Sequence, residues 1–185
     1  MEYMDFYPTR VWMDQCDLDN SRLKNKIKQF VENHQSDKRS NIGGYQGDGF
    51  IDEELNNNII KRIPIGEHIP SNSRWSIYSW VNINNRGDYN KRHHHISTKF
   101  LLCGVYYVKV PENSGRFRIY DPRGAWVKGF QDWKYYNNNS EYYYIEPKEG
   151  LLMLFPCWME HDVEPSDSDE ERISISFNLW SMDLD

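Results

Sequence analysis

Cysteine is scarce in this chain, and the few cysteines form no motif. Among 185 residues there are 3, Cys16, Cys103 and Cys157, and no two of them form a C-x-x-C pair. Their odd number and wide spacing exclude a disulfide framework and a cysteine-based zinc ribbon. We therefore expect free thiols in a reducing compartment, which indicates a cytoplasmic protein.

Long apolar runs are also missing. No stretch approaches the roughly 18 consecutive apolar residues that a membrane-spanning helix needs. The first ten residues, MEYMDFYPTR, are acidic and lack the apolar region of a secretory signal peptide. We expect neither a membrane segment nor a leader.

Basic charge is in short supply too. The net charge is −6 at pH 7, the pI is near 5.5, and no basic block stands out. Nonspecific nucleic-acid binding is therefore a poor candidate for the main activity, although a local basic groove stays open. Aromatic residues, by contrast, are abundant: they make up 15% of the chain, with 13 Tyr and 7 Trp. This composition is typical of short strands joined by polar turns.

The chain is long enough for one domain, over residues 1–185, with a substantial core. Within 1–70 we predict an edge strand near 7–13, a helix over 17–34 and a second helix over 52–63. The first helix places four apolar side chains on one face, Leu23, Ile27, Phe30 and Val31. We expect both helices to support a sheet.

From residue 75 the pattern changes to strands, and it continues to about residue 181. The last of these segments, RISISFNLW, alternates strictly, with apolar residues at Ile173, Ile175, Phe177 and Leu179. About eight short strands with turn signals between them predict a mainly β fold, a jelly roll in which two sheets enclose a cavity.

A run of three histidines, His93 to His95, lies inside this region. On a strand, residues i and i+2 point to the same face, so His93 and His95 would form half of a metal site. His161, far along the chain in FPCWMEHDVEP, is the best candidate for a third ligand. The run by itself also suits a solvated loop or an adventitious metal binder.

The segment from Trp75 to Trp180 resembles the 2-oxoglutarate and Fe(II)-dependent oxygenase superfamily. It is most similar to the prolyl-hydroxylase-like branch and to an oxygenase group of marine bacteria and their viruses. Four pieces carry the resemblance, in this order: N-x-x-H-x-H at 90–95, CGVYYVKVPENSGRFRIYDPRG at 103–124, IEPKEGLLMLFPCWMEHDVEP at 145–165 and RISISFNLW at 172–180. The resemblance implies a double-stranded β-helix (a cupin-like jelly roll), with Fe(II) and 2-oxoglutarate as cofactors and O2 as co-substrate.

The resemblance also implies the metal ligands. His93 takes the place of the first ligand and His161 that of the distal ligand. His95 stands where the superfamily usually has a carboxylate, and the marine group shares this H-x-H form. Asp88 and Asp121 are possible carboxylates from outside the motif if His95 is not a ligand.

Arg172 and Ser174 match an arginine and a serine that bind the distal carboxylate of 2-oxoglutarate in the superfamily. Because both alternate with apolar residues, both side chains point to one face of a strand, which we expect to be the interior. A guanidinium offers a carboxylate two parallel hydrogen bonds and keeps its charge. The alternative is that Arg172 is an exposed charge at a strand edge.

Three further residues are candidates for binding 2-oxoglutarate. Tyr106 matches a tyrosine that donates its hydroxyl to the same carboxylate in the prolyl-hydroxylase branch, although a plain core role suits it nearly as well. Asn82 and Asn90, ahead of Asn84, are candidates for the end of 2-oxoglutarate that chelates the metal.

We therefore expect a 2-oxoglutarate-dependent dioxygenase, a hydroxylase in which His93, His95, His161 and Arg172 are the catalytic set. A peptidyl side chain is the first expectation for the substrate, and a small metabolite is the second. One alternative is a three-histidine cupin-type iron dioxygenase that does not use 2-oxoglutarate, which leaves Arg172 without a task. The other is a non-catalytic jelly-roll binding module whose histidines are structural.

Overall fold

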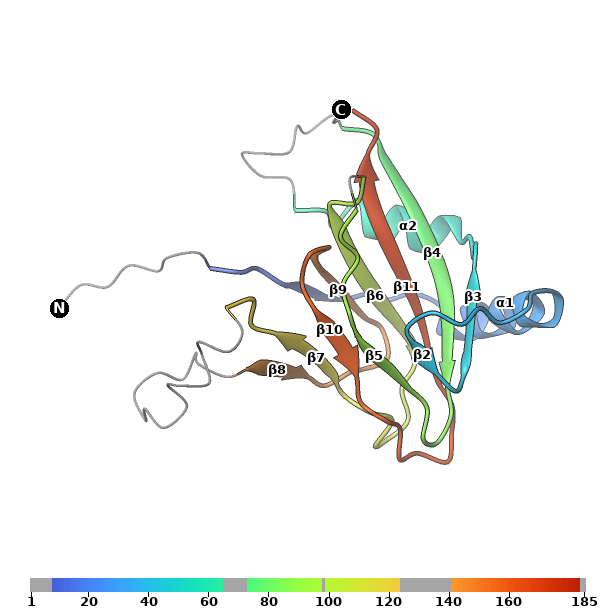
Figure 1. Ribbon diagram of the computed structural model, residues 1–185. Helices are drawn as coiled ribbons and strands as arrows, with labels where there is room; N and C mark the ends of the chain where they lie inside the picture. The colour runs from blue at the N-terminus through green and yellow to red at the C-terminus, as the bar shows by residue number, and fades with distance from the viewer. Residues whose placement is uncertain (1–7, 65–72, 98, 124–140, 184–185) are drawn as a thin grey trace.

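Two antiparallel β-sheets face each other in the computed structural model, and two helices cover one of them (Figure 1). The structure describes residues 8–64, 73–97, 99–123 and 141–183. Neither helix in these ranges is long and apolar enough to cross a membrane.

The larger sheet has six strands in the order β1-β9-β6-β11-β4-β3. Their bounds are β1 Trp12–Gln15, β9 Leu151–Pro156, β6 Leu102–Lys109, β11 Arg172–Ser181, β4 Trp75–Asn84 and β3 Tyr45–Asp48. The central strand β11 pairs with β4 along its whole length and with β6 over most of it. The expected N-terminal edge strand is present as β1, which begins at Trp12 rather than near residue 7.

The smaller sheet has five strands in the order β2-β5-β10-β7-β8. Their bounds are β2 Asn41–Ile42, β5 Tyr89–His93, β10 His161–Val163, β7 Phe117–Tyr120 and β8 Tyr142–Ile145. The short strand β10 lies at the centre, between β5 and β7, and its pairing with β5 places His161 directly opposite His93. Two histidines distant in the sequence are thus neighbours in one ladder.

Both predicted helices are confirmed. Helix α1 spans Asn20–Asn33 and α2 spans Glu53–Ile60, and the carboxylates of Asp19 and Asp52 cap their N-termini by accepting hydrogen bonds from main-chain N–H groups. Their apolar faces pack on the outer face of the six-stranded sheet, away from the smaller sheet (Figure 1).

Strand β11 separates two environments. Its apolar residues Ile173, Ile175, Phe177 and Leu179 belong to the core shared with the helices. The alternate residues, among them Arg172 and Ser174, line a pocket between the two sheets. The period of two in the sequence thus gives one strand a dry face and a polar, pocket-lining face.

The expected jelly roll is confirmed, with eight strands, β4 to β11, between Trp75 and Ser181 in the described part of the chain. One detail of the expectation was wrong. The HHH run is not strand throughout, since β5 ends at His93 and His95 lies beyond it.

Candidate metal centre

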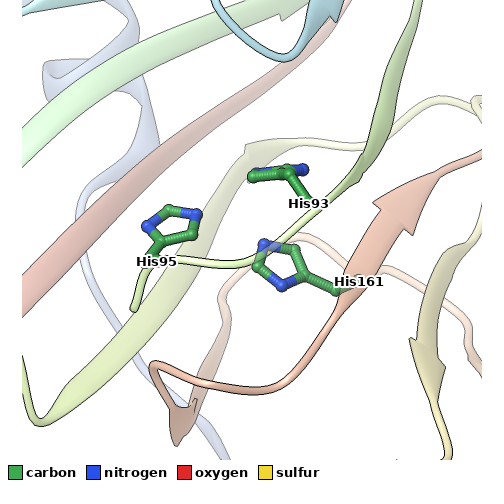
Figure 2. Close-up of side chains that lie close together, drawn as sticks. All are labelled: His93, His95 and His161. Carbon is green, nitrogen blue, oxygen red and sulfur yellow. The ribbon is translucent and has the colours of Figure 1, made fainter. Parts of the chain in front are cut away.

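Three imidazoles converge between the sheets (Figure 2). His93 ends β5, His161 begins β10, and His95 lies in the segment after β5. One ring nitrogen of each lies within 4.8 Å of the others, as a shared metal ion requires. His94, the middle residue of the run, is exposed and does not belong to this cluster.

A main-chain hydrogen bond fixes the position of His95. Its N–H donates to the carbonyl of Cys157 at 2.8 Å, in the turn that leads to β10. The ring of Trp80 stacks on the His95 imidazole at a centroid distance of 5.5 Å. His95 therefore reaches the cluster through a tertiary contact, and the strand alternation expected from the sequence does not extend to it.

Each imidazole has a hydrogen-bond acceptor at its Nδ1 atom. Nδ1 of His93 lies 2.6 Å from the carbonyl oxygen of Lys91, and Nδ1 of His161 lies 2.9 Å from that of Met159. Nδ1 of His95 lies 2.7 Å from the side-chain oxygen of Asn178. An acceptor at Nδ1 favours the Nδ1–H tautomer, which leaves the lone pair on Nε2 free for a metal.

Burial keeps these imidazoles neutral. Burial is the main cause of a lowered pKa in all three. It lowers the pKa of His93, lowers that of His95 to about 4, and lowers that of His161 well below the usual range. The hydrogen bonds to Lys91 O and Asn178 Oδ1 act in the opposite direction and are outweighed. Neutral imidazole is the form that binds a metal, so the ligands need no deprotonation near pH 7.

The chemistry of the three imidazoles is suited to binding iron. Nε2 of His95 is buried and has no hydrogen-bond partner in the described part of the chain. A buried polar atom without a partner is costly, and a metal ion removes that cost. Imidazole nitrogens are suitable ligands for iron. The three residues thus fit Fe(II).

Arg172 lies in the same pocket, with 1% of its surface exposed. Its Nη1 donates to the carbonyls of Ser114 at 2.8 Å and Gly115 at 3.1 Å, while its Nε is buried without a partner. Within the described ranges it forms no ion pair with an aspartate or glutamate. Burial lowers the pKa of its guanidinium, which still carries its charge at neutral pH. A buried cation of this kind calls for an anion beside it.

The pocket brings together most of the residues singled out from the sequence: His93, His95, His161, Arg172, Ser174, Asn82 and Asn90 all line it. Asn82 donates from Nδ2 to Ser176 Oγ at 3.0 Å, and Asn90 donates from Nδ2 to Ser40 Oγ at 3.3 Å. The alternative of an exposed Arg172 is excluded by its burial.

Tyr106 is the exception and requires a correction. Its side chain belongs to the core under the helices, and its hydroxyl donates to Asn20 Oδ1 at 2.8 Å. The next residue, Tyr107, lies opposite Ser174 in the ladder and lines the pocket instead. Burial raises the pKa of Tyr107 to about 12, so its hydroxyl stays protonated and can donate a hydrogen bond to an anion.

Two possible carboxylate ligands lie elsewhere. The Asp88 carboxylate accepts from the main chain of Asn85 at 2.8 Å, and Asp121 pairs with Arg123 at 2.6 Å. Neither belongs to the histidine cluster. Sequence reasoning also missed Asn178, although it continues the alternation that pointed to Arg172 and Ser174.

A family model described as "Putative 2OG-Fe(II) oxygenase" matches residues 78–178, more than half of the chain and most of the jelly roll. Comparison with curated protein sequences gives no match.

Several solved structures share the fold. A prolyl-4-hydroxylase of Pseudomonas putida is similar with a TM-score of 0.65 and 14% identity, over 93% of both chains. A prolyl hydroxylase of Trichoplax adhaerens, solved with a hypoxia inducible factor peptide, has a TM-score of 0.66 and 16% identity, over 92% of this chain and 83% of the other. The viral collagen prolyl hydroxylase of Paramecium Bursaria Chlorella virus-1, solved with 2OG, has a TM-score of 0.59 and 14% identity, over 91% and 94%. At such identities the likeness shows the jelly-roll fold.

Proposed function

Because the chain belongs to the 2OG-Fe(II) oxygenase family, whose cofactors are Fe(II) and 2-oxoglutarate, we propose that it is a hydroxylase that uses His93, His95 and His161 to hold the metal. One observation carries the proposal. A buried guanidinium without an ion-pair partner in the described chain lines the same pocket as three clustered imidazoles, one of which, His95, has a buried Nε2 atom without a hydrogen-bond partner there. This combination fits a metal and a dianion together.

The cofactors supply the oxidation. Bound together, Fe(II), 2-oxoglutarate and O2 would supply the oxidising power. The overall reaction converts 2-oxoglutarate to succinate and CO2 and a substrate C–H bond to C–OH. The protein contributes geometry, charge and shelter from water.

The histidines orient one another through their surroundings. Their hydrogen bonds occupy Nδ1 and so leave the Nε2 lone pair of each ring available to the metal. Phe117 and Phe155 pack against the His161 ring at centroid distances of 5.3 and 4.9 Å. Apolar walls of this kind limit the access of water and hold the rings in place.

Arg172 holds the far carboxylate of 2-oxoglutarate in this proposal. Ser174 and Tyr107 present hydroxyls on the same face and complete the donor set. Hydrogen bonds from a charged donor to a carboxylate are about twice as strong as neutral ones. Asn82 on β4 and Asn90 on β5 line the pocket from the two sheets and serve the end of the molecule nearer the metal.

For the substrate we propose a peptidyl side chain, with a small metabolite as the second choice. The support is the fold that the chain shares with prolyl hydroxylases, one of which was solved with a peptide. A cupin-type dioxygenase that does not use 2-oxoglutarate is not favoured, because it leaves the buried Arg172 without an anion.

The direct test is succinate formation from 2-oxoglutarate by protein purified without a tag and supplied with Fe(II) and O2. Peptide mixtures and metabolite pools serve as substrates, and mass spectrometry detects a gain of one oxygen atom. We expect His161→Ala to abolish succinate formation, whereas the matched control His94→Ala keeps it, because His94 is exposed and outside the cluster. Absence of succinate from the wild-type protein, or equal rates in both variants, would rule the proposal out.

A further inference from the structure

His95 differs from the other two histidines in what fixes its ring. The Nδ1 acceptors of His93 and His161 are main-chain carbonyls two residues earlier in the chain, at Lys91 and Met159. The acceptor for His95 is a side chain, Asn178 Oδ1, on the central strand of the opposite sheet. Among the three histidines, His95 is therefore the one whose Nδ1 acceptor can be removed by substituting another residue.

Asn178 is itself held in one orientation. It is 6% exposed and lies opposite Cys103 in the ladder between β11 and β6. The thiol of Cys103 donates to the same Oδ1 atom, with a sulfur–oxygen distance of 3.2 Å. Burial raises the pKa of this thiol, so it retains the proton that it donates. The hydrogen bond favours the amide orientation in which oxygen, and not NH2, faces His95.

The orientation of this amide matters for the tautomer. If the amide were flipped, its NH2 group would donate to Nδ1 of His95, and the imidazole proton would move to Nε2. An Nε2–H group points a proton at the metal position and cannot be a ligand there. A carboxylate, which the superfamily usually has in this place, keeps free lone pairs in any orientation, whereas an imidazole requires the correct tautomer.

We propose that Asn178 is a positioning residue that selects the Nδ1–H tautomer of His95 and so makes this histidine a metal ligand in place of a carboxylate, and that Cys103 orients the Asn178 amide. The inference rests on the proposed function only in assigning the metal to this cluster. Trp80, stacked on His95, fixes the plane of the ring, and Asn178 fixes which nitrogen carries the proton.

The test reads tautomers directly in the full-length, metal-free protein. Long-range ¹H–¹⁵N spectra of ¹⁵N-histidine-labelled protein distinguish Nδ1–H from Nε2–H for each ring, at a pH where the rings are neutral. We expect Nδ1–H for His95 in the wild type. In Asn178→Leu, which is similar in size but has no acceptor, we expect a mixture or the Nε2–H form. His93 and His161 serve as internal controls, since their acceptors are main-chain atoms.

Metal affinity is the second readout, with Mn(II) alone as the probe. We expect Asn178→Leu to weaken Mn(II) binding about 10- to 100-fold, the usual effect of removing a partner that orients a ligand. Asn178→Asp keeps an oxygen acceptor, so it should retain the Nδ1–H tautomer and stay within a few-fold of wild-type affinity. A purely structural role for Asn178 would not separate these two variants.

The cysteines give a matched pair for the second half of the proposal. Cys103→Ala removes the donor to Asn178 and should add some Nε2–H form at His95. Cys157→Ala removes a thiol that donates to the carbonyl of Phe100 and should leave the tautomer unchanged. Equal spectra for both variants would remove Cys103 from the proposal.

Two results would overturn the role of Asn178. One is an Nε2–H tautomer for His95 in the wild type, which needs no variant and so does not depend on whether a variant folds. The other is an unchanged tautomer and unchanged Mn(II) affinity in Asn178→Leu. Both differ from a failure of the proposed function, which would appear as wild-type protein that binds Mn(II) but forms no succinate.

Discussion

At the scale of single residues, Arg172 carries the most specific information about the ligand. It is among the largest fully buried side chains of the described residues, and it lies on the pocket face of β11. Two of its hydrogen bonds go to main-chain carbonyls, and its Nε has no partner. These bonds offset part of the cost of burying the cation, and an anion bound beside it offsets the rest.

The first prediction concerns Arg172→Met, which keeps much of the side-chain volume and removes the charge. We expect the KM for 2-oxoglutarate to rise at least ~30-fold, because losing one partner of a buried charged hydrogen-bonded pair costs about 2–5 kcal/mol. Steady-state succinate formation measures the change. Arg116→Met is the control, since Arg116 lies outside this pocket and pairs with Glu164 at 2.8 Å. Equal KM values in both variants would exclude Arg172 as the carboxylate anchor.

Much of the pocket could be predicted from the sequence at this scale. A period of two was enough to place Arg172 and Ser174 on one face, and their resemblance to a known motif predicts that this face binds a ligand. Tyr106 was misplaced because two adjacent tyrosines point to opposite faces and the sequence does not say which one faces the pocket. The register of β11 against β6 also shifts between Ile173 and Ser174. The position of His95 depends on a main-chain bond to Cys157, a tertiary contact that no local pattern encodes.

At the scale of elements, Asp52 connects the two helices that support the six-stranded sheet. Its side chain is 1% exposed, caps α2 through Leu55 N, and pairs with Arg22 at 2.7 Å and Lys26 at 2.9 Å on α1. The bond from Arg22 is the main cause that holds the pKa of Asp52 far below its usual range. Its charged form is therefore part of the folded state.

The second prediction follows from this linkage. A folded-state pKa below the unfolded value of about 3.9 gives stability that is complete above that pH and declines as the pH falls further. We expect Asp52→Ala to lower the free energy of unfolding at pH 7 by about 2 kcal/mol, through loss of the cap and of the ion pairs. Urea denaturation at pH 7 and pH 3 measures both effects.

A matched set of variants separates the two causes. Asp52→Asn keeps a good N-cap and loses the charge, so it should cost less than Asp52→Ala and should reduce the loss of stability between pH 7 and pH 3. Asp169→Asn breaks an exposed pair with Arg86 and should change the stability by less than about 0.5 kcal/mol. If Asp52→Asn loses stability on acidification as steeply as the wild type, Asp52 is not the group responsible.

Sequence periodicity predicted the bounds of the helices more closely than the ends of the strands. Both helices were predicted to within about three residues, because their apolar positions recur every 3.6 residues and an aspartate caps each start. Strand β1 is displaced from its expected bounds, since an edge strand is defined by its partner β9 and not by its own pattern. The sequence also predicts a loop over residues 125–140, all of which lie outside the described residues.

At the scale of the whole molecule, the site joins the two sheets. His93 and His161 belong to the smaller sheet, Arg172 belongs to the larger one, and His95 connects to the larger sheet through Asn178. The three imidazoles come together only in the folded chain, so a metal ion binds the folded state and not the unfolded chain. Metal binding should therefore stabilise the entire fold.

The third prediction is a thermal shift. With free Mn(II) at about 100 times its Kd, the added stability is about 2.7 kcal/mol, which corresponds to a rise in Tm of roughly 5–10 °C for a chain of this size. Scanning calorimetry of metal-free and Mn(II)-loaded protein measures it. His93→Ala should lose the shift and His94→Ala should keep it. A shift retained by His93→Ala would place the metal elsewhere.

The most direct test of the central claim is a crystal structure of the protein loaded, without oxygen, with Mn(II) in place of Fe(II) and with 2-oxoglutarate. We predict one anomalous-scattering peak bonded to the Nε2 atoms of His93, His95 and His161, and the far carboxylate of 2-oxoglutarate against the guanidinium of Arg172. A metal peak away from these three nitrogens, or a fully bound 2-oxoglutarate that leaves Arg172 without a carboxylate, would contradict the account.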